Sequence, residues 1–523
     1  MLKLTPQAAF SPVAAFSRLV STQSRLFSRA HSGAKRTVES RAAAPGPARS
    51  PWESREDTGR LLTPQSFYVT CHPGLEEVVA AELTSQNIRA QEVVPGKAGV
   101  FFRCEQGSTL TWYTQSGTAI QAGDHCCRGP DAVGYRANLW LRSGIRVLRL
   151  LAKGHLSPYR AGGDEIYSFF RQAANWARLL PPKQTFQISA RVTSCTDISS
   201  SQLVQIRGRD AICDSIRDAR GSKPEPPEKG QVANLPLYVA LFRDECSLYM
   251  DMSGDSLHKR GYRTAMHTSS LNEAAAAGVL SLASWPEALS QGHAGILADP
   301  MCGSGTFLIE AALMATNTAP GLYRQRWPFQ SWPDFDRSAW DSSVASARQA
   351  QRTWDGMLLG NDVHQGALRL AKSDARSAEV SHLIKWHSGP CSQWVPRDTP
   401  STVVVNPPWG LRLLNDAENA ESDQDTRADI FNGVRRARRG GSGGYQQAEK
   451  KLYEGTSLQA AWVDLRSFLK TQCPNANVYV LCGNPDITRE IHMRAERKMP
   501  VTVGNIDCRV LKYKVLPPKQ MPT

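Results

Sequence analysis

The stretch that decides the fold is residues 296–316, Ile-Leu-Ala-Asp-Pro-Met-Cys-Gly-Ser-Gly-Thr-Phe-Leu-Ile-Glu-Ala-Ala-Leu-Met-Ala-Thr. The short apolar run Ile296–Asp299 predicts a strand, and the apolar residues of Thr306–Thr316 predict a helix. Between them lie Gly303 and Gly305, and glycine adopts positive φ and lets a ligand approach the backbone closely. A helix that begins here has free N–H groups in its first turn. The stretch therefore predicts a cofactor cradle at the carboxyl end of a strand.

A glycine-x-glycine turn alone also fits a tight strand–helix connection that binds nothing. This one lacks the third glycine of the dinucleotide fingerprint and the lysine of a P-loop. The next predicted strand, Thr353–Gly360, leads into Asn361 and Asp362. An acid at that position can accept hydrogen bonds from ribose hydroxyls. It can equally cap the helix that is expected to begin near His364.

The third motif is Asn406-Pro407-Pro408-Trp409, which follows the predicted strand Ser401–Val405. Two prolines stiffen an extended backbone, so the Asn406 side-chain carbonyl and the Pro407 carbonyl become fixed acceptors. An aromatic amine is a poor nucleophile because its lone pair is delocalised. Two acceptors on its N–H groups would aim that pair at an electrophilic methyl by positioning and electrostatics alone, with Trp409 stacked on the base. The alternative is a proline-rich turn.

Strand and helix patterns alternate from about residue 263 onward, which predicts an α/β Rossmann-like domain with a doubly wound, mostly parallel sheet. Two α+β units precede it. Their expected elements are strands at 67–71, 99–102 and 186–192, helices at 75–83, 135–151 and 202–220, and a hairpin of 237–242 with 246–251. The arginines of the 135–151 helix are Arg136, Arg142, Arg146 and Arg149. They can follow phosphates or, more commonly, solvate a helix face.

The chain of 523 residues is long enough for about three domains. Residues 1–38 are rich in Ser, Ala and Arg and contain no acid, which is typical of an organellar transit peptide, chloroplast or mitochondrial. We expect a disordered leader and linker at 1–60. The acidic, then arginine-rich and glycine-rich stretch near 415–450 is expected to be a disordered insertion.

The net charge of +14 suits a polyanionic partner, although a basic pI alone leaves this open. The twelve cysteines include no CxxC pair, and no HExxH spacing occurs, so we expect no metal site. The longest apolar run, Ala274–Trp285, is far shorter than the roughly 20 residues of a membrane span.

The three motifs in this order resemble the amino methyltransferases of the NPPY class, which use S-adenosyl-L-methionine. Three further stretches make the likeness closer, namely 252–263, 298–312 and 319–324. They resemble the THUMP-containing guanine-N2 methyltransferases of large-subunit ribosomal RNA, the bacterial K/L type. The resemblance implies a ferredoxin-like domain at 61–132, an RNA-binding THUMP domain at 133–252 and a methyltransferase domain at 253–523.

The resemblance also implies roles for single residues. Asp299, Met301, Cys302, Gly303 and Gly305 would hold the methionine end of the cofactor, and Asp362 its ribose. Asn406, Pro407, Pro408 and Trp409 would hold the guanine. The chain departs from the family pattern at Trp409, where tyrosine is usual, and at Asn272, where lysine is frequent. It also has Ser388-Gly389-Pro390-Cys391 where an adenine-binding Asp is common.

These features leave three hypotheses. The first is an organellar enzyme that methylates N2 of a guanine in large-subunit ribosomal RNA. The second keeps the chemistry but takes tRNA, because THUMP domains also serve tRNA enzymes. The third is a non-catalytic RNA-binding ribosome-assembly factor, suggested by the departures at Trp409 and at the missing Asp.

Overall fold

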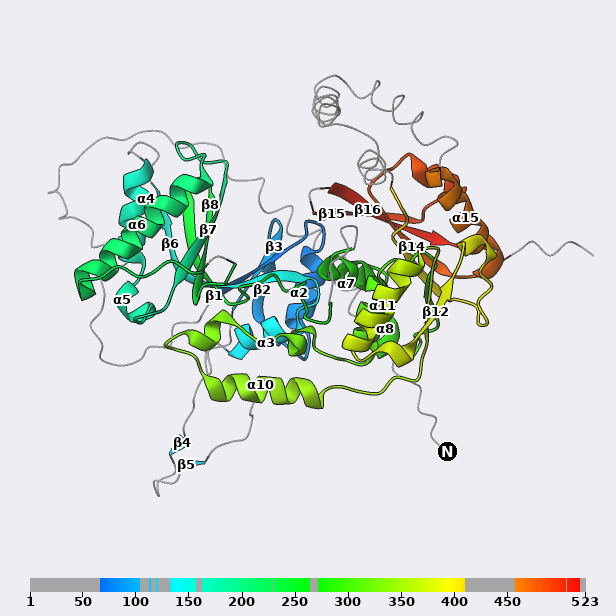
Figure 1. Ribbon diagram of the computed structural model, residues 1–523, viewed down its shortest axis with the longest axis horizontal. Coiled ribbons are helices and arrows are strands. Elements are labelled where there is room, and N and C mark those ends of the chain that lie inside the picture. Colours follow the sequence, from blue (N-terminus) through cyan, green and yellow to red (C-terminus); the bar gives the residue numbers. More distant parts are fainter. Residues whose placement is uncertain are drawn as a thin grey trace, which may run out of the picture. The chain divides into compact units, whose positions relative to one another are not determined.

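The computed structural model describes residues 66–103, 112–113, 119–120, 132–156, 162–228, 230–263, 271–409, 457–504 and 506–517. The predicted leader at 1–60 and the predicted insertion near 415–450 lie outside these residues. The described chain forms two seven-stranded sheets and a two-stranded one (Figure 1).

The first sheet has the strand order β2-β3-β1-β6-β9-β8-β7. Neighbouring strands are antiparallel except β7 and β8, which are parallel. Because β1 pairs with both β3 and β6, both predicted N-terminal units contribute to one sheet. Its strands are β1 Ser66–Cys71, β2 Gln91–Pro95, β3 Gly99–Arg103, β6 Gly144–His155, β7 Phe186–Thr193, β8 Leu235–Phe242 and β9 Glu245–Asp251, and β4 Trp112–Tyr113 pairs separately with β5 Ala119–Ile120.

Helices pack on this sheet through one apolar cluster, in which Phe170 and Ile212 join Leu237 of β8. Helix α6 begins where the Ser200 side chain accepts a hydrogen bond from the Leu203 N–H, and it ends at Gly221 in the left-handed conformation. The helices are α2 Glu76–Thr84, α3 Ala132–Trp140, α4 Gly162–Ala173, α5 Trp176–Leu179 and α6 Ser201–Arg220.

The predicted helix over residues 135–151 is wrong in its second half. Helix α3 ends at Trp140, and the chain continues from Gly144 as strand β6. This segment lies between β1 and β9 and hydrogen-bonds to both. Pairing with distant strands therefore overrides the helix-like spacing of its apolar residues.

The prediction that the arginines of this segment solvate a helix face is also wrong. Arg142 is buried and donates to the carbonyls of Leu313 and Thr318, at 3.3 and 2.8 Å. Arg149 is buried and forms an ion pair with Asp334 at 2.9 Å. These side chains hold C-terminal segments against the first sheet rather than facing solvent or phosphates.

The second sheet has the order β12-β11-β10-β13-β14-β16-β15. The pairs from β12 to β14 are parallel and those made by β16 are antiparallel, which confirms the predicted mostly parallel sheet. The chain order reverses between β10 and β13. The strands are β10 Leu297–Asp299, β11 Leu358–Asp362, β12 Ile384–Ser388, β13 Thr402–Val405, β14 Asn477–Cys482, β15 Arg497–Val503 and β16 Ile506–Lys514.

Helices cover both faces of this sheet, as a doubly wound fold requires. Leu297 and Val404 pack with α7 Glu273–Leu282, α8 Trp285–Ser290, α9 Thr306–Ala315 and α11 Gln365–Ser377. The alternate residues Ala298, Val403 and Val405 face α15 Ser457–Gln472 on the other side. Short 3-10 helices lie at η3 Ser381–Leu383, η4 Cys391–Gln393 and η5 Ile487–Ile491.

A tryptophan-rich segment separates α9 from β11. It contains η1 Pro320–Tyr323, η2 Pro328–Ser331 and α10 Arg337–Gln349. Trp327, Trp332 and Trp340 are buried in the core of the first sheet, not of the second. The Trp340 ring lies edge-on to Tyr135 of α3, with centroids 5.9 Å apart, so the segment packs alongside α3 (Figure 1).

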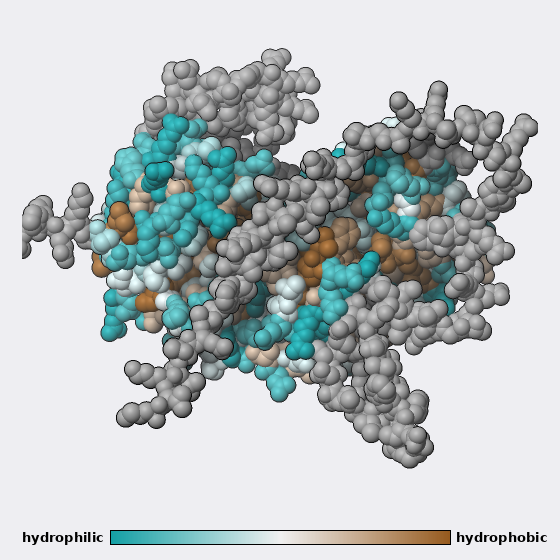
Figure 2. All heavy atoms as spheres, turned by 180° about the vertical axis from the view of Figure 1, so that it is seen from behind, coloured by the Kyte–Doolittle hydropathy of each residue, from teal (hydrophilic) through white to brown (hydrophobic). Residues whose placement is uncertain are grey.

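The described surface on the face shown in Figure 2 is mainly polar. In the view of Figure 2, hydrophilic residues cover most of the described surface and hydrophobic residues gather in a few patches. No described helix is both long and apolar enough to cross a lipid bilayer.

Candidate functional site

The three sequence motifs meet at one edge of the second sheet. Strand β10 lies between β11 and β13, with Asp299 opposite Gly360 and Ala298 opposite Val403. Asp362 and Asn406 therefore lie at or just beyond the carboxyl ends of the two strands that flank β10. Strand spacing places β11 and β13 about 10 Å apart. The site occupies the point where the strand order reverses, which is where open α/β sheets bind ligands.

The two glycines of the first motif have different surroundings. Both adopt positive φ, +53° at Gly303 and +73° at Gly305. A Cβ added to Gly303 would meet no neighbouring atom within 4 Å, whereas one added to Gly305 would lie 2.7 Å from the Trp386 ring. Gly303 thus exposes backbone that a ligand can approach, and Gly305 lets β12 pack against the start of α9.

Asp362 fixes the glycine turn through both of its carboxylate oxygens. Oδ2 accepts a hydrogen bond from the Gly303 N–H and Oδ1 accepts one from the His364 N–H, each 2.8 Å long. The alternative interpretation, an N-cap, is wrong, because the capping residue of α11 is His364. Each oxygen keeps a second lone pair, so Asp362 can still accept hydrogen bonds from hydroxyl groups.

Asp299 and Cys302 are buried beneath the turn. Burial raises the pKa of Asp299 well above its usual value, and the nearby Asp362 carboxylate adds to this, while a hydrogen bond from the Met301 N–H opposes it. Burial also raises the pKa of the Cys302 thiol well above its usual value. A buried neutral thiol is not a nucleophile. Cys302 therefore packs within the turn and takes no part in the chemistry.

Asn406 presents a buried acceptor that no described residue uses. Its Oδ1 is inaccessible to solvent and has no hydrogen-bond partner among the residues that the structure describes. Such a group costs free energy unless something binds it. The turn around it is firmly held, because the Trp462 indole N–H donates to the Pro408 carbonyl at 2.8 Å and the Pro407 ring is buried.

Trp409 closes the third motif. Its indole N–H donates to the Leu481 carbonyl at 3.0 Å, and its ring packs against Gly483. The indole N–H anchors the ring to the end of β14. Stacking of this ring on a base stays a prediction.

Asn361 also belongs to this site, although the sequence motifs did not predict a role for it. Its Nδ2 donates to the carbonyls of Pro300 and Gly389, each at 3.0 Å, and its Oδ1 lies 2.7 Å from His387 Nδ1. Asn361 therefore ties the turn after β10 to the turn after β12, which contains Pro390. The sequence signal that could have identified Asn361 is an amide side chain next to Asp362 at the end of a strand.

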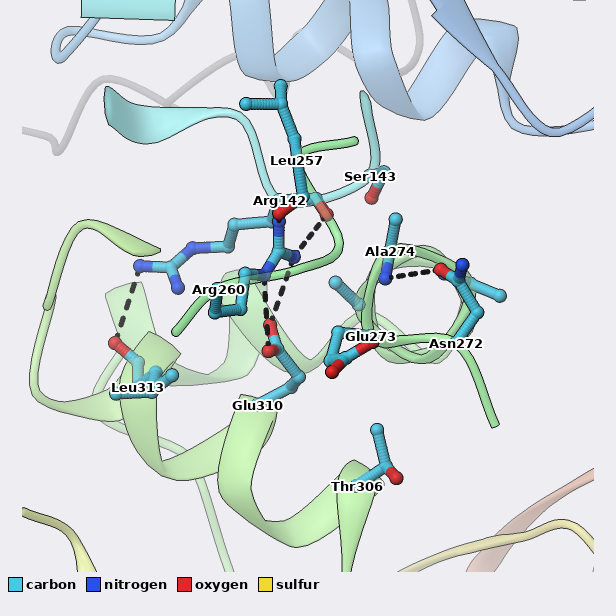
Figure 3. Close-up of polar contacts among 12 residues, drawn as sticks. Arg142, Ser143, Leu257, Arg260, Asn272, Glu273, Ala274, Thr306, Glu310 and Leu313 are labelled. Carbon is cyan, nitrogen blue, oxygen red and sulfur yellow. Dashed lines mark hydrogen bonds and ion pairs between the residues drawn. The ribbon is translucent and has the colours of Figure 1, made fainter. Parts of the chain in front are cut away.

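Helix α9, which begins at the glycine turn, is anchored from behind by the segment 252–263 (Figure 3). Glu310 of α9 is fully buried and forms an ion pair with Arg260 at 3.3 Å and accepts from the Tyr262 hydroxyl at 3.1 Å. Arg260 also donates to the Arg142 carbonyl, which lies in the connection between α3 and strand β6 of the first sheet. Arg263 contacts Thr306 in the first turn of α9 and pairs with Glu273 at 3.1 Å.

Among the described residues, no group of three or more His, Cys, Asp or Glu side chains is placed to hold a metal ion.

Three family models match the chain. A RlmL ferredoxin-like domain matches residues 66–110, a THUMP domain matches 163–251, and a RMKL-like methyltransferase domain matches 260–424. The last match contains all three motifs of the site.

The chain is also similar to proteins of known sequence or structure. It is 28% identical to a candidate RNA methyltransferase of Synechocystis sp., over 87% of this chain and 97% of that protein. It is 31% identical to the ribosomal RNA large subunit methyltransferase K/L of Allochromatium vinosum, over 78% of this chain and 50% of that protein. It thus spans about half the length of the K/L relatives. A candidate methyltransferase crystallised with S-adenosylhomocysteine has the same fold, with a TM-score of 0.62 and 20% identity over 88% of this chain and 99% of that one.

Proposed function

We propose that this chain, which has the ferredoxin-like, THUMP and RMKL-like methyltransferase domains and is similar to the ribosomal RNA large subunit methyltransferases of the K/L type, methylates the exocyclic N2 amine of a guanine in RNA. The single observation that carries the proposal is the buried Oδ1 of Asn406, which has no hydrogen-bond partner in the described part of the chain. In this proposal, the amino group of a nucleobase donates the hydrogen bond that this acceptor lacks.

S-adenosylmethionine is the cofactor of this family, and the residues present fit it. When bound, it supplies a methyl group on a sulfonium, which is an electrophile without further activation. The open backbone at Gly303 can receive its methionine part. The free lone pairs of Asp362 can accept hydrogen bonds from its ribose hydroxyls, as in other Rossmann-like sites.

In this reaction the protein has to position the guanine amine for attack on the methyl group. Asn406 Oδ1 and the Pro407 carbonyl would each accept one N–H of the guanine amine, which reduces the conjugation of its lone pair with the ring. The two prolines and the Trp462 hydrogen bond keep these acceptors rigid, so little reorganisation is needed. The target base must leave its stack to reach this buried position.

Large-subunit ribosomal RNA is the proposed substrate, because the chain carries the domain set of the K/L relatives. The order of Asp299, Gly303, Asp362 and Asn406 at one sheet edge supports an enzyme over a non-catalytic RNA-binding factor. Methylation of tRNA instead would appear as an outcome of the test below.

We also propose an organellar address, which rests on the acid-free, Arg- and Ser-rich residues 1–38. A fluorescent fusion to residues 1–60 should reach chloroplasts or mitochondria. A fusion that stays in the cytosol would refute this address and leave the enzymatic proposal intact.

The decisive test of the activity is transfer of an isotope-labelled methyl group from S-adenosylmethionine to ribosomal RNA or tRNA. The RNA is then digested and its nucleosides are identified by mass spectrometry. We expect N2-methylguanosine from large-subunit ribosomal RNA. Label in another nucleoside refutes the guanine-N2 assignment, label in tRNA alone refutes the substrate, and no label in any RNA refutes the activity.

A further inference from the structure

A cavity of about 830 Å³ lies beside the Asn406–Trp409 turn, outside the site described above. Gly483 lines this cavity and also supports Trp409, because a Cβ on Gly483 would lie 2.8 Å from the indole Cε3. Neither Asp362 nor Asn406 lines it. The Trp409 ring thus lies next to both the candidate acceptor site and this second cavity.

The β15–β16 hairpin forms the floor of the cavity. The register pairs Lys498 with Leu511 and Pro500 with Arg509, and all four line the cavity. The alternate residue Met499 points to the opposite face and packs in the core. Helix η5 and the loop after it form the other wall.

This floor is held in place by the first sheet. The Thr502 N–H of β15 donates to the Pro73 carbonyl at 2.9 Å, and a Cβ on Gly74 would lie 2.2 Å from the Pro500 carbonyl. Only glycine, with φ +93°, permits this close approach. The turn after β1 therefore packs directly on the hairpin, and the cavity exists before a ligand binds.

The lining combines cations with an apolar floor. Four exposed basic side chains line the cavity, namely Arg489, Arg494, Lys498 and Arg509. Arg489 is paired with Asp486 at 3.3 Å, and the other three have no carboxylate partner among the described residues. The one acid in the lining is Asp507. Met493 and Pro500 supply apolar surface.

We propose that this cavity binds the single-stranded RNA nucleotide next to the target guanine. The proposal rests on the proposed function, since it assigns the RNA segment that enters with the flipped base. Cations along a groove neutralise phosphates, and apolar surface can pack against a base without reading its sequence. The volume lies in the range of sites that hold molecules of nucleotide size.

The test compares two charge-reversal pairs on the same hairpin. Lys498→Glu with Arg509→Glu changes the cavity face. Arg497→Glu with Lys512→Glu is the matched control, because these two residues are paired in register, lie outside the cavity lining and change the charge equally. The probe is a fluorescent single-stranded RNA of about ten nucleotides, titrated into the full chain with saturating S-adenosylhomocysteine.

We expect the cavity pair to weaken oligonucleotide binding about tenfold and to lower the slope of log affinity against log salt by about 1.4, for two lost phosphate contacts. The control pair should change binding less than about twofold. Equal effects of both pairs, or no effect of the cavity pair, would overturn the proposal.

Two further measurements keep the outcome unambiguous. Calorimetry with S-adenosylmethionine reports whether each variant is folded, and Lys498→Gln with Arg509→Gln replaces the reversal if that pair unfolds. If the wild type transfers no methyl group to RNA, the proposed function fails, while the oligonucleotide titration still decides whether the cavity binds RNA.

Discussion

At the scale of single residues, Gly303 and Gly305 have different roles: Gly303 leaves space for the cofactor, whereas Gly305 leaves space for the side chain of Trp386. Both have left-handed φ, so alanine at either position costs about 1 kcal/mol of folding free energy. Beyond that cost, a Cβ on Gly303 meets no protein atom, whereas a Cβ on Gly305 lies 2.7 Å from Trp386. The two glycines therefore form a matched pair with different expected phenotypes.

We predict that Gly303→Ala weakens S-adenosylmethionine binding by about tenfold or more with little further loss of stability, because the Cβ occupies the space where the cofactor approaches the backbone. Gly305→Ala should instead lower the free energy of unfolding by a further 1–3 kcal/mol or so, through overpacking. Calorimetry and urea unfolding measure the two effects. The same affinity loss in both variants would argue against a cofactor site at Gly303.

At the scale of elements, the strands and helices around the three motifs were predicted from sequence because their signals are local. Apolar runs that end at Asp299, Asp362 and Asn406 mark strands, and the glycines mark the turn into α9. Strand β6 was missed because its pairing with β1 and β9 is not local. Asn361 was missed for a similar reason, since its hydrogen-bond partners Pro300 and Gly389 are distant in sequence.

The segment that links the two sheets contains a titratable group with a clear pH signature. Burial, together with the nearby charges of Arg260 and Lys259, lowers the pKa of His258 to about 4. In the unfolded chain the pKa of this histidine is about 6.5. Between these values the unfolded state holds more protons, so stability falls as the pH falls.

We predict that the free energy of unfolding decreases from about pH 6.5 to about pH 4, and that His258→Gln flattens this part of the profile. Glutamine can keep a hydrogen bond to Ser256, whose Oγ lies 2.6 Å from His258 Nδ1. Urea unfolding at several pH values is the measurement. An unchanged slope in the variant would mean that His258 is not the group responsible.

At the scale of the whole molecule, the two sheets are joined by the buried polar group around Glu310 (Figure 3). The sequence indicated the segment 252–263 only through its resemblance to a family, and gave no sign that Arg260 and Arg142 would meet. Such contacts depend on where two domains touch. The same holds for Trp327, Trp332 and Trp340, which lie between α9 and β11 along the chain but pack in the core of the first sheet.

We predict that Glu310→Ala lowers the free energy of unfolding by about 3–5 kcal/mol, because it leaves the buried Arg260 guanidinium without its partner. Lys259→Ala is the control. It removes the pair with Asp255, in which both side chains are about half exposed, at 54% and 48%, and should cost less than about 1 kcal/mol. Comparable losses in both variants would contradict a structural role for the buried pair.

The central claim is that Asn406 Oδ1 accepts a hydrogen bond from the amine that is methylated. Single-turnover methyl transfer, with RNA and cofactor both saturating, tests it most directly. Asn406→Ala should slow this step by about 100-fold or more while both affinities stay unchanged, and Asn406→Asp, which keeps an acceptor oxygen, should retain more of the rate. A rate for Asn406→Ala equal to that of the wild type would contradict the account.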